Sequence, residues 1–523
     1  MSAPATPAEF DVLVVGGGIN GAGIARDLAG RGQRVLLCEQ DDLASHTSSS
    51  STKLIHGGLR YLEHGEFTLV RKALAERERL MRSAPHIMWG LRFVIPQERP
   101  HDPGHASVRP AWLIRIGLFL YDHLARRAWL PDSRRVDLRK HAAGAPLQRR
   151  FRQGFIYSDG WVDDARLVVL NAIDAAARGA TVLTRWRCVD AQRGADDWQV
   201  TLRSAAGETK LVTSRALINA AGPWAAQFLG EHAHMPHPRA LRLVKGSHIV
   251  VRKLFDHDHA YLLQGADRRV VFAIPYEGEF TLIGTTEVEH TGAIGEAHID
   301  EAEVAYLCEQ VSRCFARPVA PADVVWSYAG VRPLLEDGSG DAAAVTRDYA
   351  LELDTQGASL LSVWGGKLTT FRKLSEEAAD LLTAPLNIAS GPWTANAALP
   401  GGDLSAYIGP ADRPDADFER FVRVLAVRHP DIPAALLRRW AHGHGSRIGL
   451  LFTPQGLGLE VAPGLFEAEL HCLHDHEWAR CADDVLWRRT KLGLHLTPAQ
   501  REAVARWCEA HWGASAAAIK PPG

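Results

Sequence analysis

The chain has 523 residues, of which 46% are hydrophobic and 23% are charged, and its formal net charge is −2. This composition is typical of a globular protein with two or three domains, excludes a largely disordered chain and argues against a nucleic-acid partner. None of the seven cysteines forms a C-x-x-C pair, so we expect no zinc or other metal site and a reducing, cytoplasmic compartment.

A dinucleotide-binding motif begins near the N-terminus. An apolar run over residues 12–15 predicts a buried parallel strand, a helix follows over 19–29, and a second strand over 35–37 leads to Glu39. Three glycines span the turn and the start of the helix at G-x-G-x-x-G spacing: Gly16, Gly18 and Gly21. This spacing lets a pyrophosphate reach the helix N-terminus, and Glu39 suits a ribose diol. The motif predicts an adenine dinucleotide but does not choose between NAD and FAD.

A serine-rich stretch over residues 45–52 follows Glu39 and leads into His-Gly-Gly-Leu-Arg-Tyr at 56–61. By composition alone the serine run predicts a flexible linker. Hydroxyls and backbone amides that crowd beside a phosphate-binding turn instead suit a cofactor pyrophosphate. We therefore expect this stretch to belong to the site.

Later segments supply further pieces of a Rossmann-like core. Residues 217–224 predict a buried strand that ends in a turn, and residues 360–370 predict a strand and a glycine turn before another helix. Between them, residues 270–288 predict a β-hairpin. Residues 404–515 have helical spacing and predict a separate all-α domain. Their glycine-rich segment at 443–449 follows a helical pattern, so we expect no second dinucleotide.

Several long motifs resemble those of the FAD-dependent, membrane-associated glycerol-3-phosphate dehydrogenases, a family with the D-amino-acid-oxidase-like fold. The resemblance runs over nearly the whole chain. Its motifs lie at residues 16–25, 51–63, 159–166, 219–224, 245–248, 330–333, 365–370, 475–478 and 483–491. No departure at a motif position puts the chemistry in doubt.

The resemblance implies oxidation of sn-glycerol 3-phosphate to dihydroxyacetone phosphate. FAD, bound noncovalently, would take the hydride, and a membrane quinone would take the electrons. It further implies a cytoplasmic protein attached peripherally to the inner face of the plasma membrane. The helical domain could serve dimerisation, regulation or structure, so a homodimer is among the assemblies considered.

The expected fold class is α/β, or α+β overall, with a Rossmann-like FAD-binding domain of D-amino-acid-oxidase type. The FAD-binding domain is expected to be discontinuous, over residues 10–90, 150–240 and 330–390. A β-rich substrate or cap region occupies 91–149 and 241–329, and the helical domain occupies 398–515.

The cofactor contacts that these motifs predict are Gly16, Gly18, Ile19, Asn20, Gly21, Glu39, Thr47, Ser48, Ser51, Lys53, Leu54, His56, Gly222, Gly366, Lys367, Leu368 and Thr369. The last four lie where a strand gives way to a helix. A helix N-terminus aimed at the flavin would stabilise its reduced form, and Lys367 would add a full charge there or reach the substrate.

Oxidation of this substrate requires a cation that binds the phosphate and a group that accepts the hydroxyl proton. Arginine suits the phosphate, and Arg60 and Arg332 lie in resembling motifs, with Tyr61 as a nearby hydroxyl donor. Histidine suits the proton, and His56 and His248 lie in such motifs. Either histidine could be the base while the other holds the substrate. The expected catalytic set is His56, His248, Arg332 and Lys367, and the expected substrate-binding set is Arg60, Tyr61, Arg332 and His248.

Residues 109–131 form the best candidate for lipid contact. Arg115, Asp122 and Arg126 fall on one helical face, and Trp112 and Trp129 lie near the ends, as suits the headgroup boundary of a bilayer. A buried helix that packs on the flavin domain is the alternative, and the pattern slightly favours it.

Two other functions fit parts of the sequence. A flavin oxidase that passes electrons to oxygen needs no dedicated motif, so the residues alone do not separate it from a quinone-linked enzyme. A flavin-bearing scaffold without turnover could use the helical domain as a binding module. The presence together of His56, Arg60, His248, Arg332 and Lys367 argues against the scaffold.

Overall fold

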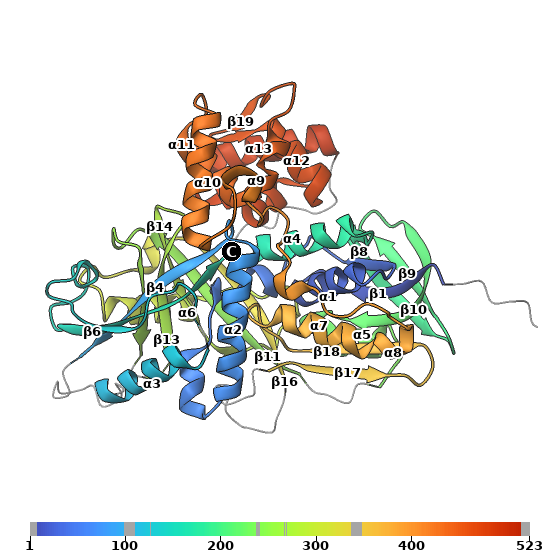
Figure 1. Ribbon diagram of the computed structural model, residues 1–523, viewed down its shortest axis with the longest axis horizontal. Helices are drawn as coiled ribbons and strands as arrows, with labels where there is room; N and C mark the ends of the chain where they lie inside the picture. Colours follow the sequence, from blue (N-terminus) through green and yellow to red (C-terminus); the bar gives the residue numbers. More distant parts are fainter. Residues whose placement is uncertain are drawn as a thin grey trace, which may run out of the picture.

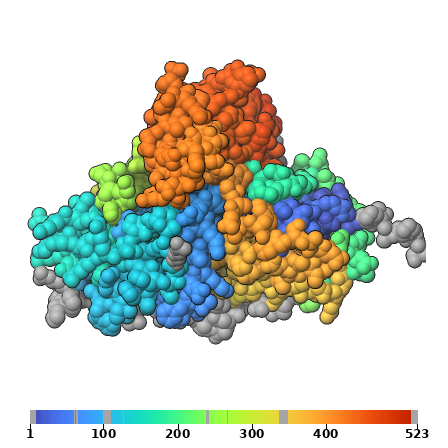
Figure 2. Space-filling model, viewed as in Figure 1, coloured from blue at the N-terminus to red at the C-terminus, as the bar shows by residue number. Residues whose placement is uncertain are grey.

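The computed structural model describes residues 8–98, 110–125, 127–236, 241–265, 267, 269–335 and 348–513, without the side chains of Arg60, Glu63 and His64. Two large sheets lie beside each other, and a helical region stands over them (Figure 1). In the space-filling view the helical region, orange to red, rises from the body as a distinct mass (Figure 2).

The first sheet is the predicted Rossmann-like core. Its strands run in the order β17-β18-β10-β1-β2-β7, with a β8–β9 hairpin joined to β10. Their bounds are β1 Phe10–Val15, β2 Val35–Glu39, β7 Thr181–Thr184, β8 Trp186–Arg193, β9 Trp198–Ser204, β10 Thr209–Asn219, β17 Ala350–Asp354 and β18 Ser359–Trp364. Strands β18, β10, β1, β2 and β7 pair in parallel.

Alternate residues of β1 fill the two faces of this sheet, as expected for a parallel strand covered on both sides. Val12 and Val14 pack with helix α1 (Ile19–Gly30), while Leu13 and Val15 pack with Trp198 on the opposite face. Further helices bordering the sheet are α4 Asp164–Ala177, α5 Ala225–Glu231, α7 Phe371–Leu381 and α8 Thr383–Leu386. The sequence therefore placed the strand, turn and helix of the dinucleotide motif correctly.

The second sheet has ten strands in the order β15-β11-β14-β13-β12-β4-β6-β3, with β16 beside β11 and β5 beside β6. The bounds are β3 Leu54–Ile55, β4 Met88–Gln97, β5 Arg134–Asp137, β6 Gln153–Val162, β11 Leu241–Arg252, β12 His259–Gln264, β13 Val270–Tyr276, β14 Phe280–Gly284, β15 Val288–Glu289 and β16 Val324–Leu335. The predicted hairpin is confirmed by the antiparallel pair β13 and β14. The helices associated with this second sheet are α2 Phe67–Ser83, α3 Ala111–His123 and α6 Glu301–Ser312.

Several strands of the second sheet contain residues that the predicted boundaries place in the FAD-binding domain. Strand β6 lies in the second sheet, although residues 150–240 were assigned to the FAD-binding domain, and β3 and the end of β16 join it too. The reason is local: β6 leads directly into α4 and then β7, which along the sequence looks like one strand-helix-strand unit of the first sheet. Hydrophobic patterning does not show which sheet a strand joins.

The helical region contains α9 Ser405–Ile408, α10 Pro414–Arg428, α11 Ala434–His444, α12 Glu467–Glu477, a π-helix at Asp484–Arg489 and α13 Pro498–Trp512. It has two hydrophobic cores, one centred on Trp440 and the other on Trp507. A two-stranded hairpin, β19 (Glu460–Ala462) and β20 (Leu465–Phe466), turns at Gly464. The expectation of an all-α domain therefore needs this small correction.

Helix α3 (Ala111–His123) forms only part of the candidate lipid-contact segment, residues 109–131, and buries one face. Ile114, Leu118 and Tyr121 are buried, whereas the exposed apolar side chains are Trp112, Leu113, Ile116 and Phe119. Trp129 packs against a core beyond the helix, and Arg126 lies outside the described residues. Among the described residues, no helix is long and apolar enough to cross a membrane.

Candidate active site

The turn after β1 has the geometry that the glycine pattern requires. Gly16 has φ +110°, and a Cβ there would lie 2.5 Å from the carbonyl oxygen of Ala220, the residue that follows the neighbouring strand β10. Gly21 packs against the carbonyl oxygen of Gly16, which leaves no room for a side chain. These two positions bring the N-terminus of α1 close to the sheet edge, where a pyrophosphate is expected.

Glu39 ends β2 at the same edge. Its carboxylate accepts hydrogen bonds from the backbone N–H groups of Gly17, at 2.6 Å, and Asp41, at 2.9 Å. Burial raises the pKa of the Glu39 carboxyl above its ordinary value, and the two backbone donors oppose that shift. The donors fix the carboxylate beside the turn, as a ribose-binding acid requires.

Two adjoining cavities extend from this edge. The first, of about 160 Å³, is lined by predicted cofactor residues: Gly16, Gly18, Ile19, Asn20, Glu39, Thr47, Ser48, Gly222 and Gly366. The second, of about 330 Å³, is lined by Ile19, Thr47, Ser48, Ser51, Leu54, His56, Tyr61, His248, Arg332, Gly366, Lys367, Leu368 and Thr369. Several residues line both cavities, so the two cavities form one elongated site. Its shape suits a dinucleotide with a second ligand at one end.

Comparison with known proteins identifies the kind of site. The family model described as FAD dependent oxidoreductase matches residues 11–372. The chain belongs to this family. FAD is its cofactor, and the choice between NAD and FAD that the glycine motif left open is thereby made.

Relatives of this FAD-dependent oxidoreductase are similar over almost their whole length. A glycerol-3-phosphate dehydrogenase of Pseudomonas aeruginosa is 50% identical, covering 96% of this chain and 95% of the relative. A D-erythritol 1-phosphate dehydrogenase of Brucella abortus is 47% identical, and the match covers 96% of this chain and 98% of the relative. A crystal structure of the glycerol-3-phosphate dehydrogenase from Bacillus halodurans with FAD superposes with a TM-score of 0.77 at 26% identity, covering 96% and 90%.

The residues between the two cavities fit FAD. Asn20 donates from its amide nitrogen to the carbonyl oxygen of Gly365, at 3.0 Å, while its own carbonyl oxygen is buried without a hydrogen-bond partner in the described part of the chain. Ser48 accepts from the backbone N–H of Ile19, the first residue of α1. The unpartnered carbonyl oxygen of Asn20 suits a hydroxyl or N–H donor of FAD, and Ser48 fixes the loop against the N-terminus of α1, where the pyrophosphate is expected.

Lys53 has a different role from the one expected. It lines neither cavity, and its buried ammonium donates to Asp164, at 2.7 Å, and to the carbonyl oxygen of Ser49, at 3.0 Å. Asp164 also accepts from the hydroxyl of Ser51, at 2.7 Å. The lysine therefore fixes the serine-rich loop, which in turn lines the FAD site.

His248 is one of the buried residues among the predicted site residues. It lies on β11 and is 1% exposed, and its Nε2 is 2.9 Å from the hydroxyl oxygen of Thr52. Its Nδ1 is buried and has no hydrogen-bond partner among the described residues. Burial, with the charges of Arg332 and Lys53, holds the pKa of His248 well below its usual value. The imidazole is therefore neutral at pH 7 and retains a lone pair able to accept a proton.

Arg332 lies on β16 and reaches the second cavity. Its guanidinium donates to the hydroxyl of Thr285, at 3.1 Å, and to the carbonyl oxygen of Thr286, at 3.3 Å, and pairs with Glu287 at 3.3 Å. Its side chain is 29% exposed, so it remains accessible to an anion entering the cavity. A partly exposed guanidinium that lines a cavity suits a phosphate.

The segments after β3 and β18 bring the other predicted residues to this cavity. The backbone N–H of His56 donates to the hydroxyl of Thr369, at 3.3 Å, and the Lys367 ammonium lies 4.4 Å from the ring centroid of Tyr61. His56, Tyr61 and Lys367 thus share one cavity with His248 and Arg332. The side chain of Arg60 lies outside the described residues, so its substrate role stays a prediction.

The polar residues that sequence reasoning missed at the second cavity include Thr52, Thr285 and Glu287, which line it, and Tyr328, which stacks on His248. Thr52 could have been found, because it lies within the serine-rich loop. Tyr328 could not, because it meets His248 only through the antiparallel register of β11 and β16. Cross-strand partners far apart in sequence leave no local pattern.

Proposed function

We propose that this oxidoreductase oxidises sn-glycerol 3-phosphate to dihydroxyacetone phosphate. The observation that carries the proposal is the placement of Arg332 and the neutral His248 in one cavity that adjoins the FAD site. An arginine for a phosphate and a buried base for a hydroxyl are what the oxidation of a phosphorylated alcohol requires. The names of the similar dehydrogenases point to the same substrate.

The roles follow from the contacts. Arg332 binds the substrate phosphate and sets its orientation, and Thr285 and Thr286 hold the guanidinium. His248 accepts the proton of the C2 hydroxyl as the hydrogen on C2 departs with its electron pair. FAD supplies the hydride acceptor. Of the two histidines considered, His248 is the proposed base because its buried Nδ1 has no competing partner among the described residues.

A longer polyol phosphate is the second candidate substrate. The relative from Brucella abortus that is named a D-erythritol 1-phosphate dehydrogenase is almost as similar as the one from Pseudomonas aeruginosa. The proposed chemistry is the same for both substrates, because each is a secondary alcohol beside a phosphorylated carbon chain. The difference would lie in how the cavity of about 330 Å³ accommodates the added carbon.

We further propose a membrane quinone as the electron acceptor and peripheral attachment to the cytoplasmic face of the plasma membrane. A third, apolar cavity of about 150 Å³ lies beneath α3 and shares Leu59, Leu262 and Val270 with the second cavity. The exposed apolar side of α3 lies next to it. An apolar path from a lipid-facing helix towards FAD suits a quinone better than it suits oxygen, which needs no such path.

The test is anaerobic mixing of the holoenzyme with each alcohol while flavin absorbance is recorded. Bleaching by glycerol 3-phosphate, faster than by erythritol phosphate, is expected, and absence of bleaching by both contradicts the proposal. Adding a soluble quinone analogue or oxygen to the reduced enzyme then compares the acceptors. Reoxidation that is faster with oxygen, with release of peroxide, would identify an oxidase instead.

A further inference from the structure

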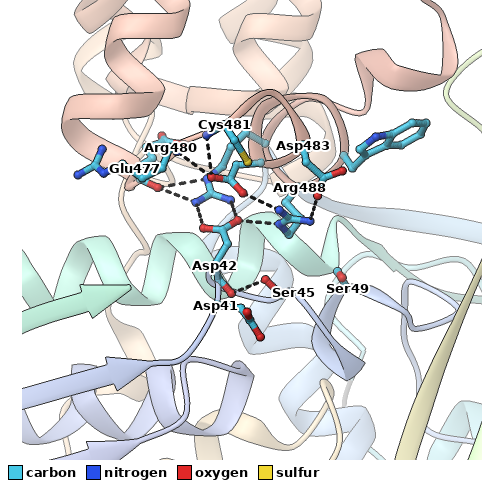
Figure 3. Close-up of polar contacts among 12 residues, drawn as sticks. Asp41, Asp42, Ser45, Ser49, Glu477, Arg480, Cys481, Asp483 and Arg488 are labelled. Atoms are coloured by element: carbon cyan, nitrogen blue, oxygen red, sulfur yellow. Dashed lines mark hydrogen bonds and ion pairs between the residues drawn. The ribbon is translucent and has the colours of Figure 1, made fainter. Parts of the chain in front are cut away.

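A buried cluster of charges joins the helical region to the loop that follows Glu39 (Figure 3). Arg489 donates two hydrogen bonds to the carboxylate of Asp42, at 2.7 and 2.8 Å, and Arg488 donates a third, at 2.6 Å. The side chains of Arg489 and Asp42 are 0% and 1% exposed. Both arginines lie in the π-helix Asp484–Arg489, more than 440 residues from Asp42 in the sequence.

The same π-helix holds the loop at a second point. Asp484 accepts from the guanidinium of Arg185, at 2.8 Å, and the backbone N–H of Arg185 donates to the carbonyl oxygen of Asp41, at 2.8 Å. Asp42 is thus held by its side chain, and Asp41 is held by its backbone carbonyl oxygen. The helical region fastens two consecutive residues of this loop.

These two residues control a segment that forms the wall of the FAD site. The backbone N–H of Asp41 donates to Glu39, and the carbonyl oxygen of Asp42 accepts from the hydroxyl of Ser45, at 2.7 Å. His46 lies 2.8 Å from the carboxylate of Asp41. On either side of Asp41 and Asp42, Gln40 and residues 44–48 of the loop line the first cavity. A shift of Asp42 would therefore move groups that line the cavity where FAD is expected.

Burial makes this arrangement more than an incidental domain contact. Charged groups removed from water cost several kcal/mol each unless they are paired and hydrogen-bonded, so Asp42 in its buried position depends on the two arginines. Arg488 also donates to Asp483 and Asp484, and Arg489 donates to the carbonyl oxygen of Glu477. Contacts within the helical region thus hold both arginines in addition to their bonds with Asp42.

We propose that Arg488 and Arg489 are positioning residues for FAD, which makes the helical region part of the cofactor site. They act through Asp42 on the loop between Glu39 and Ser48. The helical region, which touches neither cavity by itself, thereby slows the release of the cofactor.

The test measures FAD release from the holoenzyme by the rise in flavin fluorescence after dilution. Arg489→Met and Asp42→Asn are each expected to speed release about tenfold or more, and the double variant is expected to be no faster than the faster single one. This non-additivity identifies one shared interaction, which a general loss of stability would not produce. Thermal unfolding of each apo variant is recorded alongside.

Arg439→Met is the matched control. Arg439, whose side chain is 24% exposed, forms a two-bonded ion pair with the buried Glu469 inside the helical region, with both contacts at 2.6 Å, and does not reach the FAD loop. The Arg439→Met variant is expected to have a lower unfolding temperature but to release FAD within about twofold of the wild-type rate. If Arg489→Met does not fold, Arg489→Lys keeps the charge, loses the paired contacts and should still speed release about threefold. Release at the wild-type rate, or equal acceleration by Arg439→Met, overturns the proposal.

Discussion

The imidazole of His248 stacks on the phenol ring of Tyr328, with ring centroids 4.8 Å apart and planes inclined by 16°. The two residues face each other across β11 and β16, and the Tyr328 hydroxyl donates to the carbonyl oxygen of Ser51, at 2.8 Å. Tyr328 also packs against Trp326, which stacks on Trp487 of the helical region. The orientation of the proposed base is therefore set by this aromatic stack together with the Thr52 hydroxyl, 2.9 Å from its Nε2.

Replacement of His248 tests its role as base. His248→Gln should slow flavin reduction by roughly 10²–10⁴-fold, the usual contribution of a general base, while FAD stays bound. Because burial holds the pKa of His248 well below 6.5, the wild-type rate should not fall as the pH is lowered from about 8 to about 6. Rapid-mixing kinetics over this range give both results. His56→Gln is the comparison, and a larger loss there would transfer the role to His56.

Changes at Tyr328 test whether the stack positions the imidazole. Tyr328→Phe keeps the ring and should cost about threefold or less in kcat/KM, whereas Tyr328→Leu removes the stack and should cost about tenfold, mainly in kcat. Steady-state kinetics with glycerol 3-phosphate measure the difference. Equal effects of both variants would indicate that the hydroxyl, not the ring, holds His248.

Arg332→Ala tests the phosphate site. Loss of a charge-assisted contact should cost on the order of 2–4 kcal/mol of transition-state binding, or roughly 30–1000-fold in kcat/KM. Arg332→Lys should recover only part, because it lacks the planar fork. Arg252→Ala removes an exposed arginine from the neighbouring strand β11 and serves as the control. A loss of less than about threefold in Arg332→Ala, with FAD still bound, would exclude this assignment.

Lys367 should tune the flavin electrostatically. Its ammonium lies in the second cavity over the ring of Tyr61, so Lys367→Met should make the flavin midpoint potential more negative. A shift of about 30 mV corresponds to ~1.4 kcal/mol for a two-electron couple, and a change of this order is expected. Spectroelectrochemical titration measures it. Lys373→Met, on the outer side of α7, should leave the potential unchanged, and an unchanged potential in Lys367→Met would remove the electrostatic role.

The part of the fold that could be predicted from the sequence was the part with local signals. The glycine turn, its flanking strands and the hairpin at residues 270–288 each follow from spacing and alternation within a short window. The placement of β6 in the second sheet could not be predicted, because its pairing with β4 is a contact between distant segments. The helical spacing after residue 404 likewise gave no sign of the short β19–β20 hairpin.

The site divides in the same way. Glu39 and Gly16 could be predicted as cavity residues because the dinucleotide motif is contiguous, whereas the buried pair of Lys53 and Asp164 joins residues 111 positions apart. The aspartate was invisible to a local reading, so the lysine was assigned to the cofactor directly. Asp42 was missed for the same reason, since its arginine partners lie in the last part of the chain.

Histidines at the junction of α11 with the body should make stability depend on pH. Burial lowers the pKa of both His442 and His444 to about 4. The unfolded chain, with pKa near 6.5, binds protons first as the pH falls, so stability is intact above about 6.5 and is lost towards about 4, by about 2 kcal/mol per histidine at about pH 5. Urea unfolding at about pH 7.5 and about pH 5 measures this loss. His442→Gln should reduce it, and an undiminished loss would place the titration elsewhere.

The exposed apolar face of α3 is expected to contact lipid. Trp112 and Phe119 are 64% and 53% exposed and lie on the side of the helix that faces away from the buried Leu118. Apolar side chains in this position enter the boundary of a bilayer, so the double variant Trp112→Ser/Phe119→Ser should float poorly with liposomes that retain the wild-type protein. Val427→Ser, which removes a side chain 82% exposed on α10 of the helical region, is the control. Flavin reduction by substrate should be unchanged in the double variant, because neither side chain lines the second cavity. Flotation equal to that of the wild type would show that another surface makes the contact.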